Sequence, residues 1–165
     1  MWERHNGKGI TMGYLISEIA RYVVQFADKE LNSPVRNSAL QNILTNIQIK
    51  FIKETGYPAF KDAEFELWTY SLADPLTYYI FTSCLGKPLK CDNRFFTSAG
   101  IAEVNWQSRS HKRWVDEIVR DAVRNGFLAS DRDFFLKMSV KYKTYDKIPL
   151  EEFKNYAECL KSQEQ

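Results

Sequence analysis

The sequence has few of the residues on which most catalytic and metal sites depend. Its 165 residues include two histidines, His5 and His111, and three cysteines, Cys84, Cys91 and Cys159. No two cysteines have the short spacing of a zinc site, and one would remain unpaired in any disulfide scheme. We therefore expect no metal ion or other cofactor, and a reducing, cytoplasmic environment.

Long apolar runs and glycine-rich loops are also missing. No segment approaches the roughly 18 consecutive apolar residues of a membrane span, and residues 1–11 lack an apolar signal region. The sequence Gly7-Lys8-Gly9 does not have the spacing of a phosphate-binding loop. We expect no association with a membrane, and we expect residues 1–11 to form a flexible leader.

Neither sign of charge is in large excess, because 23 basic and 21 acidic residues leave a net charge of only +2. This balance argues against a large electrostatic footprint for nucleic acid. Locally, Arg109, Lys112 and Arg113 lie near Trp106, and such a mixture of charge and ring surface can bind single strands. Two acidic residues follow directly, so a solvated helix face is the favoured interpretation and nucleic-acid binding is the weaker alternative.

What the sequence does contain is a regular helical period. Hydrophobic residues make up 44% of the chain, enough for a packed core, and in most segments they recur every three or four residues. Within the second predicted helix, Gln41 and Gln48 are expected to face away from the core. The predicted helices cover residues 12–31, 38–55, 75–85, 110–125, 132–138 and 150–160, with a further short helix within 87–107.

Residues 59–70 follow a different period. Phe65 and Leu67 alternate with polar neighbours, which predicts one short strand or hairpin. Asp74 would cap the following helix, because Pro75 at the first helical position loses no hydrogen bond there.

These elements together predict the fold class. It is mainly α, and α+β at most, with about six to seven helices and one short strand or hairpin. Residues 12–160 would form a single compact domain, and residues 161–165 would form a frayed tail.

Candidates for catalysis are few. His111 is the only histidine outside the leader, and it lies in the first turn of a predicted helix, where the helix dipole disfavours a cation. A neutral surface histidine is therefore the favoured interpretation. The carboxylate pairs Glu64/Glu66 and Asp131/Asp133 fit an exposed strand edge and a helix cap better than a glycosidase pair. We expect no enzymatic activity.

Three segments in the first half of the chain have an order and spacing that resemble a known family. They are residues 37–44 (NSALQNIL), 55–60 (TGYPAF) and 64–70 (EFELWTY). They are similar to the Panacea domain, the SocA-like family of phage-associated proteins and antitoxins, from Met12 to about Gly86. Residues 71–73 (SLA) stand where the family has Gly-Pro-Val, so the chain resembles a divergent member.

The resemblance implies a function. It implies a helical domain without catalytic activity that neutralises a toxin or effector by direct binding, in the cytosol of a bacterial host and in many cases encoded by a phage or prophage. The alternative is a phage-encoded counter-defence protein that binds and inhibits a host immune nuclease or sensor. A third possibility is an enzyme whose site lies around His111 and the neighbouring arginines.

The aromatic residues of the segment 66–79 are candidates for partner binding. Large rings can either fill a core or act as interface anchors. From the strand period we expect Trp68 and Tyr79 to lie in the core, and Tyr70 and Tyr78 to be partly exposed. The loop 71–73 is a candidate specificity element. The predicted partner-binding residues are Trp68, Tyr70, Ser71, Leu72, Asp74 and Tyr78.

Overall fold

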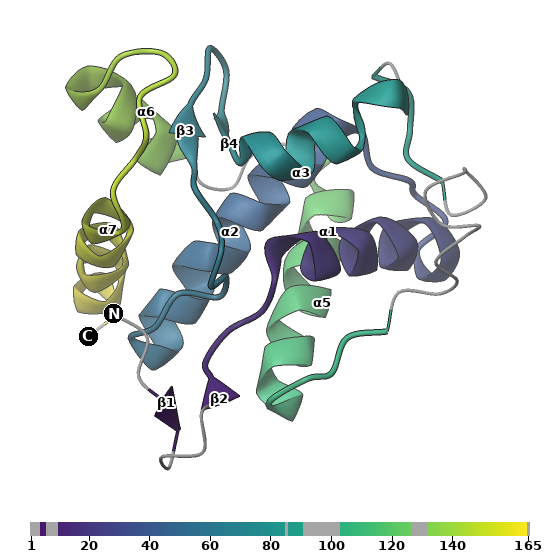
Figure 1. Cartoon of the computed structure of the whole chain (residues 1–165), viewed down its shortest axis with the longest axis horizontal. Helices are drawn as coiled ribbons and strands as arrows, with labels where there is room; N and C mark the ends of the chain where they lie inside the picture. The colour runs from purple at the N-terminus through teal and green to yellow at the C-terminus, as the bar shows by residue number, and fades with distance from the viewer. Residues whose placement is uncertain (1–3, 6–9, 85, 91–102, 127–131, 165) are drawn as a thin grey trace.

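The computed structural model describes residues 4–5, 10–84, 86–90, 103–126 and 132–164. Within these residues the chain forms six α-helices and two antiparallel strand pairs (Figure 1), which confirms the prediction of a mainly α fold. The elements are β1 (Arg4–His5), β2 (Ile10–Thr11), α1 (Ile16–Gln25), the π-helix η1 (Phe26–Glu30), α2 (Asn37–Thr55), β3 (Glu66–Leu67), β4 (Leu72–Ala73), α3 (Pro75–Ile80), the 3₁₀-helix η2 (Thr82–Cys84), α5 (Arg109–Arg124), α6 (Arg132–Lys141) and α7 (Leu150–Gln163).

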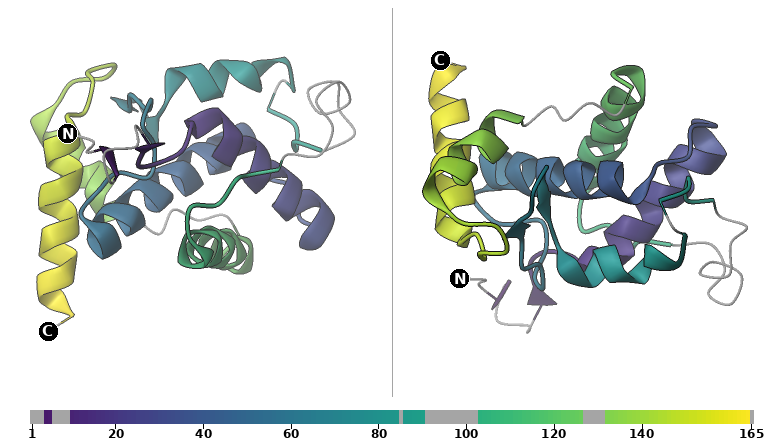
Figure 2. Two further views of the ribbon diagram at one scale, coloured as in Figure 1. Left: turned by 60° about the horizontal axis from the view of Figure 1, so that its bottom comes forward. Right: turned by 90° about the horizontal axis from the view of Figure 1, so that it is seen from above.

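Helix α2 lies at the centre of the molecule. Both views of Figure 2 show it between α3 and α5, with α7 packed across one end. It buries its apolar residues, and it also buries Gln41 and Gln48, so the expectation that these two amides face away from the core is wrong. Gly56 ends the helix in the left-handed conformation, with φ of 81°, as the sequence predicted.

Helix α1 begins later than predicted. Residues 12–15 were expected to start the helix, but the backbone of Tyr14 pairs with a distant segment. Its N–H donates to Ala59 O at 2.8 Å, and Lys61 N donates to Tyr14 O at 3.0 Å. The helix starts only at Ile16, whose N–H donates to Asp62 Oδ1 at 2.8 Å. A long-range pairing therefore overrides the local helical period.

Strands β3 and β4 form the predicted hairpin. Glu66 pairs with Ala73 and Leu67 with Leu72. Directly after β4, the side chain of Asp74 accepts a hydrogen bond from Thr77 N at 3.0 Å and so caps α3, which confirms the predicted cap. The hairpin and α3 are thus joined without an intervening loop.

The inner face of α3 differs from the prediction. Thr77 is fully buried, whereas Tyr79, which was expected in the core, is 66% exposed. The bonds between Asp74 and Thr77 fix the rotation of this six-residue helix, and Phe81, directly after it, fills the core instead. Trp68, the other ring expected in the core, is only half-buried.

The second half of the chain contains α5, α6 and α7. Helix α5 begins one residue before the predicted start, and Ser108 caps it by accepting a hydrogen bond from Ser110 N at 3.1 Å. The short helix expected within 87–107 falls largely on residues 91–102, outside the described residues, as does Asp131. Helix α7 continues through Gln163.

Candidate functional site

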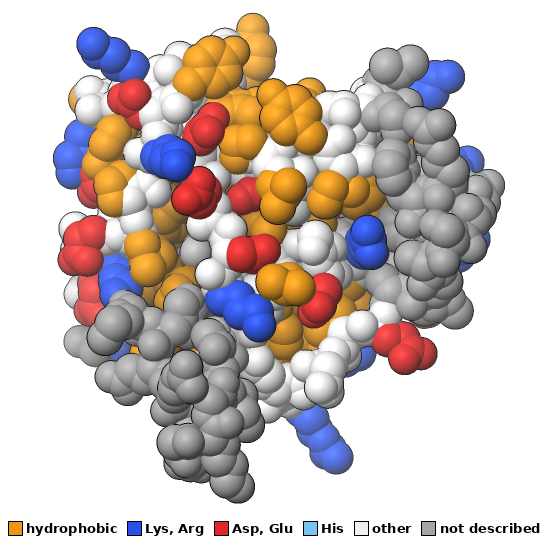
Figure 3. All heavy atoms as spheres, viewed as in Figure 1, with side chains coloured by type: hydrophobic (Ala, Val, Ile, Leu, Met, Phe, Trp, Pro, Cys, Tyr) orange, Lys and Arg blue, Asp and Glu red, His pale blue; other side chains and the backbone are white. Residues whose placement is uncertain are grey.

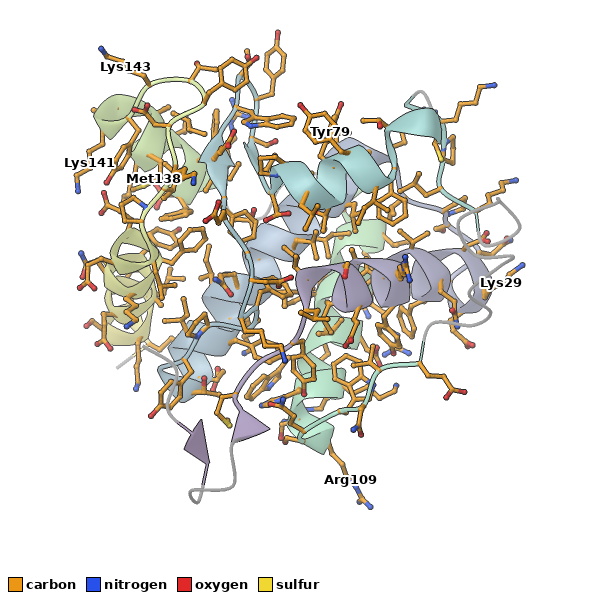
Figure 4. All side chains as sticks on the ribbon, viewed as in Figure 1. Lys29, Tyr79, Arg109, Met138, Lys141 and Lys143 are labelled. Carbon is orange, nitrogen blue, oxygen red and sulfur yellow. The ribbon has the colours of Figure 1, made fainter. Side chains whose placement is uncertain are left out.

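Five aromatic side chains gather where the hairpin, α3 and the α6–α7 connection meet. We call this group the aromatic ledge and define it as Trp68, Tyr70, Tyr78, Tyr79 and Tyr145. Tyr70 is 88% exposed, Tyr145 68% and Tyr79 66%, whereas Trp68 and Tyr78 are half-buried. Figure 3 shows hydrophobic side chains along the upper edge of the molecule, above β3, β4 and α3, and Figure 4 shows Tyr79 pointing outward from α3.

Four rings of the ledge, those of Trp68, Tyr78, Tyr79 and Tyr145, form edge-to-face pairs. The ring centroids of Trp68 and Tyr78 are 4.8 Å apart with an interplanar angle of 68°. Those of Trp68 and Tyr145 are 6.3 Å apart at 69°, and those of Tyr78 and Tyr79 are 6.1 Å apart at 82°. Such arrangements are favourable because the positive edge of one ring meets the negative face of the next.

Trp68 is held by its neighbours in the hairpin. Its indole Nε1–H donates to Glu66 Oε1 at 3.1 Å, and its backbone N–H donates to Ser71 O at 2.9 Å, which closes the turn between the strands. Tyr70 lies at the tip of this turn. The turn therefore presents one ring to solvent and fixes the other against the domain.

Four of the five rings line a groove of about 270 Å³ that is open to solvent. Trp68, Tyr70, Tyr78 and Tyr145 form its walls, and Gln41 of α2 contributes to its lining. Tyr79 belongs to the ledge but not to the groove. The remaining lining residues are Ser38, Thr69, Ser71 and Ala73.

A buried polar network lies under the ledge. Gln41 Oε1 accepts a hydrogen bond from Asp74 N at 2.9 Å, and Asp74 Oδ2 accepts one from Glu64 N at 2.9 Å. Asn37 Nδ2 donates to Tyr78 O at 2.9 Å. Buried polar groups that are satisfied in this way fix a single arrangement of the surrounding backbone. The network thus ties the hairpin and α3 to the central helix.

The predicted partner-binding residues occupy two layers. Tyr70 is exposed and Tyr78 is half-buried, which confirms the exposure expected for both, and Ser71 is half-buried beside them. Leu72 and Asp74 are each only 2% exposed, so they lie beneath the surface and position the rings instead of contacting a partner.

Two residues of the ledge were missed by the sequence analysis. Tyr79 was assigned to the core, and Tyr145 was not among the predicted partner-binding residues. Tyr145 comes from a distant part of the chain and is joined to β3, because its N–H donates to Leu67 O at 2.6 Å and Leu67 N donates to Asp146 O at 2.9 Å. No local pattern around Tyr145 indicates this pairing.

His111 is buried in an aromatic cluster, so the prediction of a surface histidine is wrong. It is 8% exposed because it shares the inner face of α5 with Val115 and Val119. Its ring centroid lies 4.8 Å from that of Phe51, and Tyr14 Oη is 2.7 Å from His111 Nδ1. Burial lowers the pKa of His111, which favours the neutral form.

The hydrogen bonds of Tyr14 define how His111 is held. Gln107 N donates to Tyr14 Oη at 2.7 Å, so the phenolic hydrogen is available to the unprotonated Nδ1 of neutral His111. Burial also raises the pKa of Tyr14. This arrangement is that of a neutral histidine bonded within a core.

The basic residues proposed as a nucleic-acid patch are partly neutralised. Lys112 Nζ lies 2.7 Å from Asp116 Oδ2, and Arg113 Nε lies 3.9 Å from Glu117 Oε1, both one turn along α5. Arg109 extends away from the lower end of α5 (Figure 4). The three cations therefore do not form an unopposed basic surface.

The described residues offer neither a grouped set of metal ligands nor a membrane-spanning helix. Across residues 4–5, 10–84, 86–90, 103–126 and 132–164, no three His, Cys, Asp or Glu side chains are grouped as a metal site would need. None of the helices in this part of the chain has both the length and the apolar character for crossing a bilayer. Comparison of the chain with known protein families, with curated proteins and with solved structures returned no match.

Proposed function

We propose that this chain is a protein-binding module without enzymatic activity, which neutralises a toxin or another effector by direct binding in the bacterial cytoplasm. The observation that carries the proposal is the aromatic ledge. Three of its rings, Tyr70, Tyr79 and Tyr145, are more than half exposed and lie together on a buried, hydrogen-bonded base. Contiguous exposed apolar surface of this kind marks interaction sites.

The ledge suits binding in energetic terms. Tyrosine and tryptophan bury large areas on association and have few rotatable bonds to restrain, so they serve as interface anchors. Trp68 and Tyr78 are already held by ring contacts and by the hairpin turn, which reduces the entropy lost when a partner docks. The similarity of residues 37–44, 55–60 and 64–70 to the Panacea domain favours a toxin or effector as the partner.

Affinity capture from the native host tests the proposal. The tagged chain should retain one protein in stoichiometric amount, and the double variant Tyr70→Ala/Tyr79→Ala should retain at least roughly tenfold less, because two anchor rings are removed. A matched control is Leu136→Ala/Val140→Ala, an exposed apolar pair on α6 outside the ledge. This control should capture the partner as the unchanged chain does.

Growth of cells supplies the second measurement. Expression of the captured protein alone should slow growth, and co-expression of the chain should restore it, whereas the Tyr70→Ala/Tyr79→Ala variant should not. Equal capture by all three chains would contradict the role of the ledge. Turnover of a small molecule by the purified chain, with no protein captured, would contradict the proposal as a whole.

A further inference from the structure

The groove in the ledge has the form of an aromatic cage. We use this name for the four rings that line it, those of Trp68, Tyr70, Tyr78 and Tyr145. Trp68 makes steep angles of 68° with Tyr78 and 69° with Tyr145, so the rings stand as separate walls and do not form one flat surface. The groove they line, of about 270 Å³, is open to solvent on one side.

The charge around the cage is complementary to a cation. No lysine or arginine is among the residues that line the groove. Glu66 lies against the Trp68 ring, since its Oε1 accepts the indole N–H at 3.1 Å. The faces of aromatic rings carry negative potential, and a cation held within about 6 Å of them is attracted. A phosphate or another anion would meet only rings, amides and hydroxyls.

Two lysines of the same chain lie near the cage but do not occupy it. Lys147 Nζ is engaged by Glu64 Oε2 at 3.0 Å. Lys143 extends away from the body of the domain (Figure 4). Arg132 lies beside Tyr70 in a neighbouring pocket and does not line the groove. These three cations therefore leave the walls of the cage open to a cation from outside.

The backbone of Tyr145 supplies a second, independent observation. Its φ is 75°, a left-handed conformation that is unfavourable for a residue with a Cβ. It is the third residue of a turn closed by Asp146 N donating to Lys143 O at 3.0 Å, a position that glycine usually occupies in such turns. Strained residues of this kind concentrate at binding sites, and here the strain holds a ring against Trp68.

We propose that the aromatic cage receives a positively charged side chain, an arginine or a lysine, of the protein partner. That the cation belongs to a protein partner rests on the proposed function. The binding of an organic cation does not, because it follows from the rings and the carboxylate alone. The cage thus supplies specificity for a basic residue at the centre of the docking surface.

The experiment is a titration of the full ¹⁵N-labelled chain, followed by the nuclear magnetic resonance signal of the Trp68 indole N–H. The probes are Nα-acetyl-arginine amide, Nα-acetyl-lysine amide and, as the neutral isostere, Nα-acetyl-citrulline amide. At least one cationic probe should shift the signal saturably at millimolar concentration, and citrulline should bind at least roughly tenfold more weakly, since it lacks the charge.

Variants assign the effect to the cage. Tyr145→Leu should weaken binding of the cationic probe by at least roughly fivefold, and Glu66→Gln by roughly threefold, because each removes part of the attraction. Tyr145→Phe keeps the ring and should bind as the unchanged chain does. Leu136→Ala is the control, since Leu136 is an exposed residue of α6 outside both the ledge and the groove. Retained dispersion of the spectra confirms that each variant is folded.

The outcomes separate this inference from the proposed function. Equal binding of citrulline and arginine, or no saturable shift with any probe, would overturn the cage even if a partner protein is captured. Saturable binding of a cation that Tyr145→Leu abolishes would establish the cage even if no toxin or effector is found. Loss of cation binding in Leu136→Ala would also overturn the assignment, because that side chain lies outside the groove.

Discussion

At the scale of single residues, Tyr145 combines an unfavourable backbone with an exposed ring. Its left-handed φ of 75° would be adopted by glycine without steric cost, yet the chain places there a tyrosine that is 68% exposed. An exposed ring contributes little to the stability of the core. A strained backbone beneath an exposed ring is what the proposed role of Tyr145 in binding would require.

The backbone strain at Tyr145 leads to a prediction about stability. Tyr145→Gly and Tyr145→Ala both remove the ring, but only glycine relieves the strain. We expect the glycine variant to have the higher free energy of unfolding, by about 1 kcal/mol. Urea denaturation followed by circular dichroism measures the difference. An alanine variant as stable as the glycine variant would show that the turn is not strained.

His111 gives a prediction about pH. Burial lowers its pKa in the folded state, while in the unfolded chain the value is about 6.5. The unfolded state therefore binds more protons as the pH falls, and the stability that is fully present above about pH 7 declines between about pH 7 and the lower folded pKa. The free energy of unfolding should be smaller at about pH 5.5 than at about pH 7.5.

Two variants isolate the histidine responsible. His111→Asn keeps an acceptor for the Tyr14 hydroxyl and should flatten the pH dependence, although its packing among the rings is poorer. The other histidine of the sequence supplies the control: His5→Gln should leave the dependence unchanged if the dependence arises from His111. If the pH dependence of stability persisted in His111→Asn, it would arise from other titratable groups.

Residue-scale predictions failed where polar bonds decide orientation. The apolar period placed Tyr79 inside, but α3 has only six residues, too few for the period to fix a face. The bonds of Thr77 to Asp74 fix it instead. His111 was expected at the surface of the first turn of its helix, yet its side chain faces the core.

At the scale of elements, the junction between α2, β4 and α3 depends on the side chain of Gln41. This amide is 1% exposed, and it accepts the N–H of Asp74 and contacts Thr77 Oγ1 at 3.5 Å. An apolar residue of similar size would leave the N–H of Asp74 buried without a partner. The position of the ledge on the domain is set by this bond.

Gln41→Leu should therefore lower the free energy of unfolding by about 1–3 kcal/mol, the cost of an unsatisfied buried donor. It should also increase hydrogen exchange at the Asp74 amide. Ser38→Ala, an exposed change on the same helix, should stay within about 0.5 kcal/mol of the unchanged chain. Unaltered exchange at Asp74 in Gln41→Leu would mean that another group replaces the bond.

Element boundaries were predictable where local chemistry sets them. Gly56 ends α2 and Asp74 begins α3, because a left-handed glycine and a capping carboxylate act within a few residues. The start of α1 was not predictable. It depends on the pairing of Tyr14 with residues 59–61, which are far away in the sequence.

At the scale of the whole molecule, α7 closes the core against α2 and the hairpin. Phe153 is 1% exposed, and its ring centroid lies 5.3 Å from that of Phe65 and 4.8 Å from that of Phe134. It thus joins three segments that are distant in the sequence. Such a contact couples the unfolding of these segments into one transition.

Phe153→Ala should lower the free energy of unfolding by about 3–5 kcal/mol, because it opens a cavity at this junction. The control Tyr79→Ala, which truncates an exposed ring, should change it by less than about 1 kcal/mol. Near-ultraviolet and far-ultraviolet circular dichroism in urea should report the same midpoint for each chain. Separate midpoints would show that α7 unfolds independently of the rest.

The assembly of the ledge is the part of the site that sequence reasoning could not supply. The hairpin rings Trp68 and Tyr70 were identified from the alternating period and its turn. Tyr145 reaches the same place only because residues 145–146 hydrogen-bond to Leu67. No local sequence pattern predicts a contact between such distant segments, so only the folded structure reveals it.

Gln41 and Gln48 stand seven positions apart on α2, and each bonds to the backbone of a different distant segment. Gln41 bonds to Asp74 N, and Gln48 Oε1 accepts the N–H groups of Ala59 at 2.8 Å and Phe60 at 3.3 Å. Since seven residues are about two helical turns, both amides project from one side of the helix. A shift of α2 by a single residue would break the bonds of both glutamines together. The helix therefore fixes the position of the aromatic ledge relative to the segment around Ala59 and Phe60.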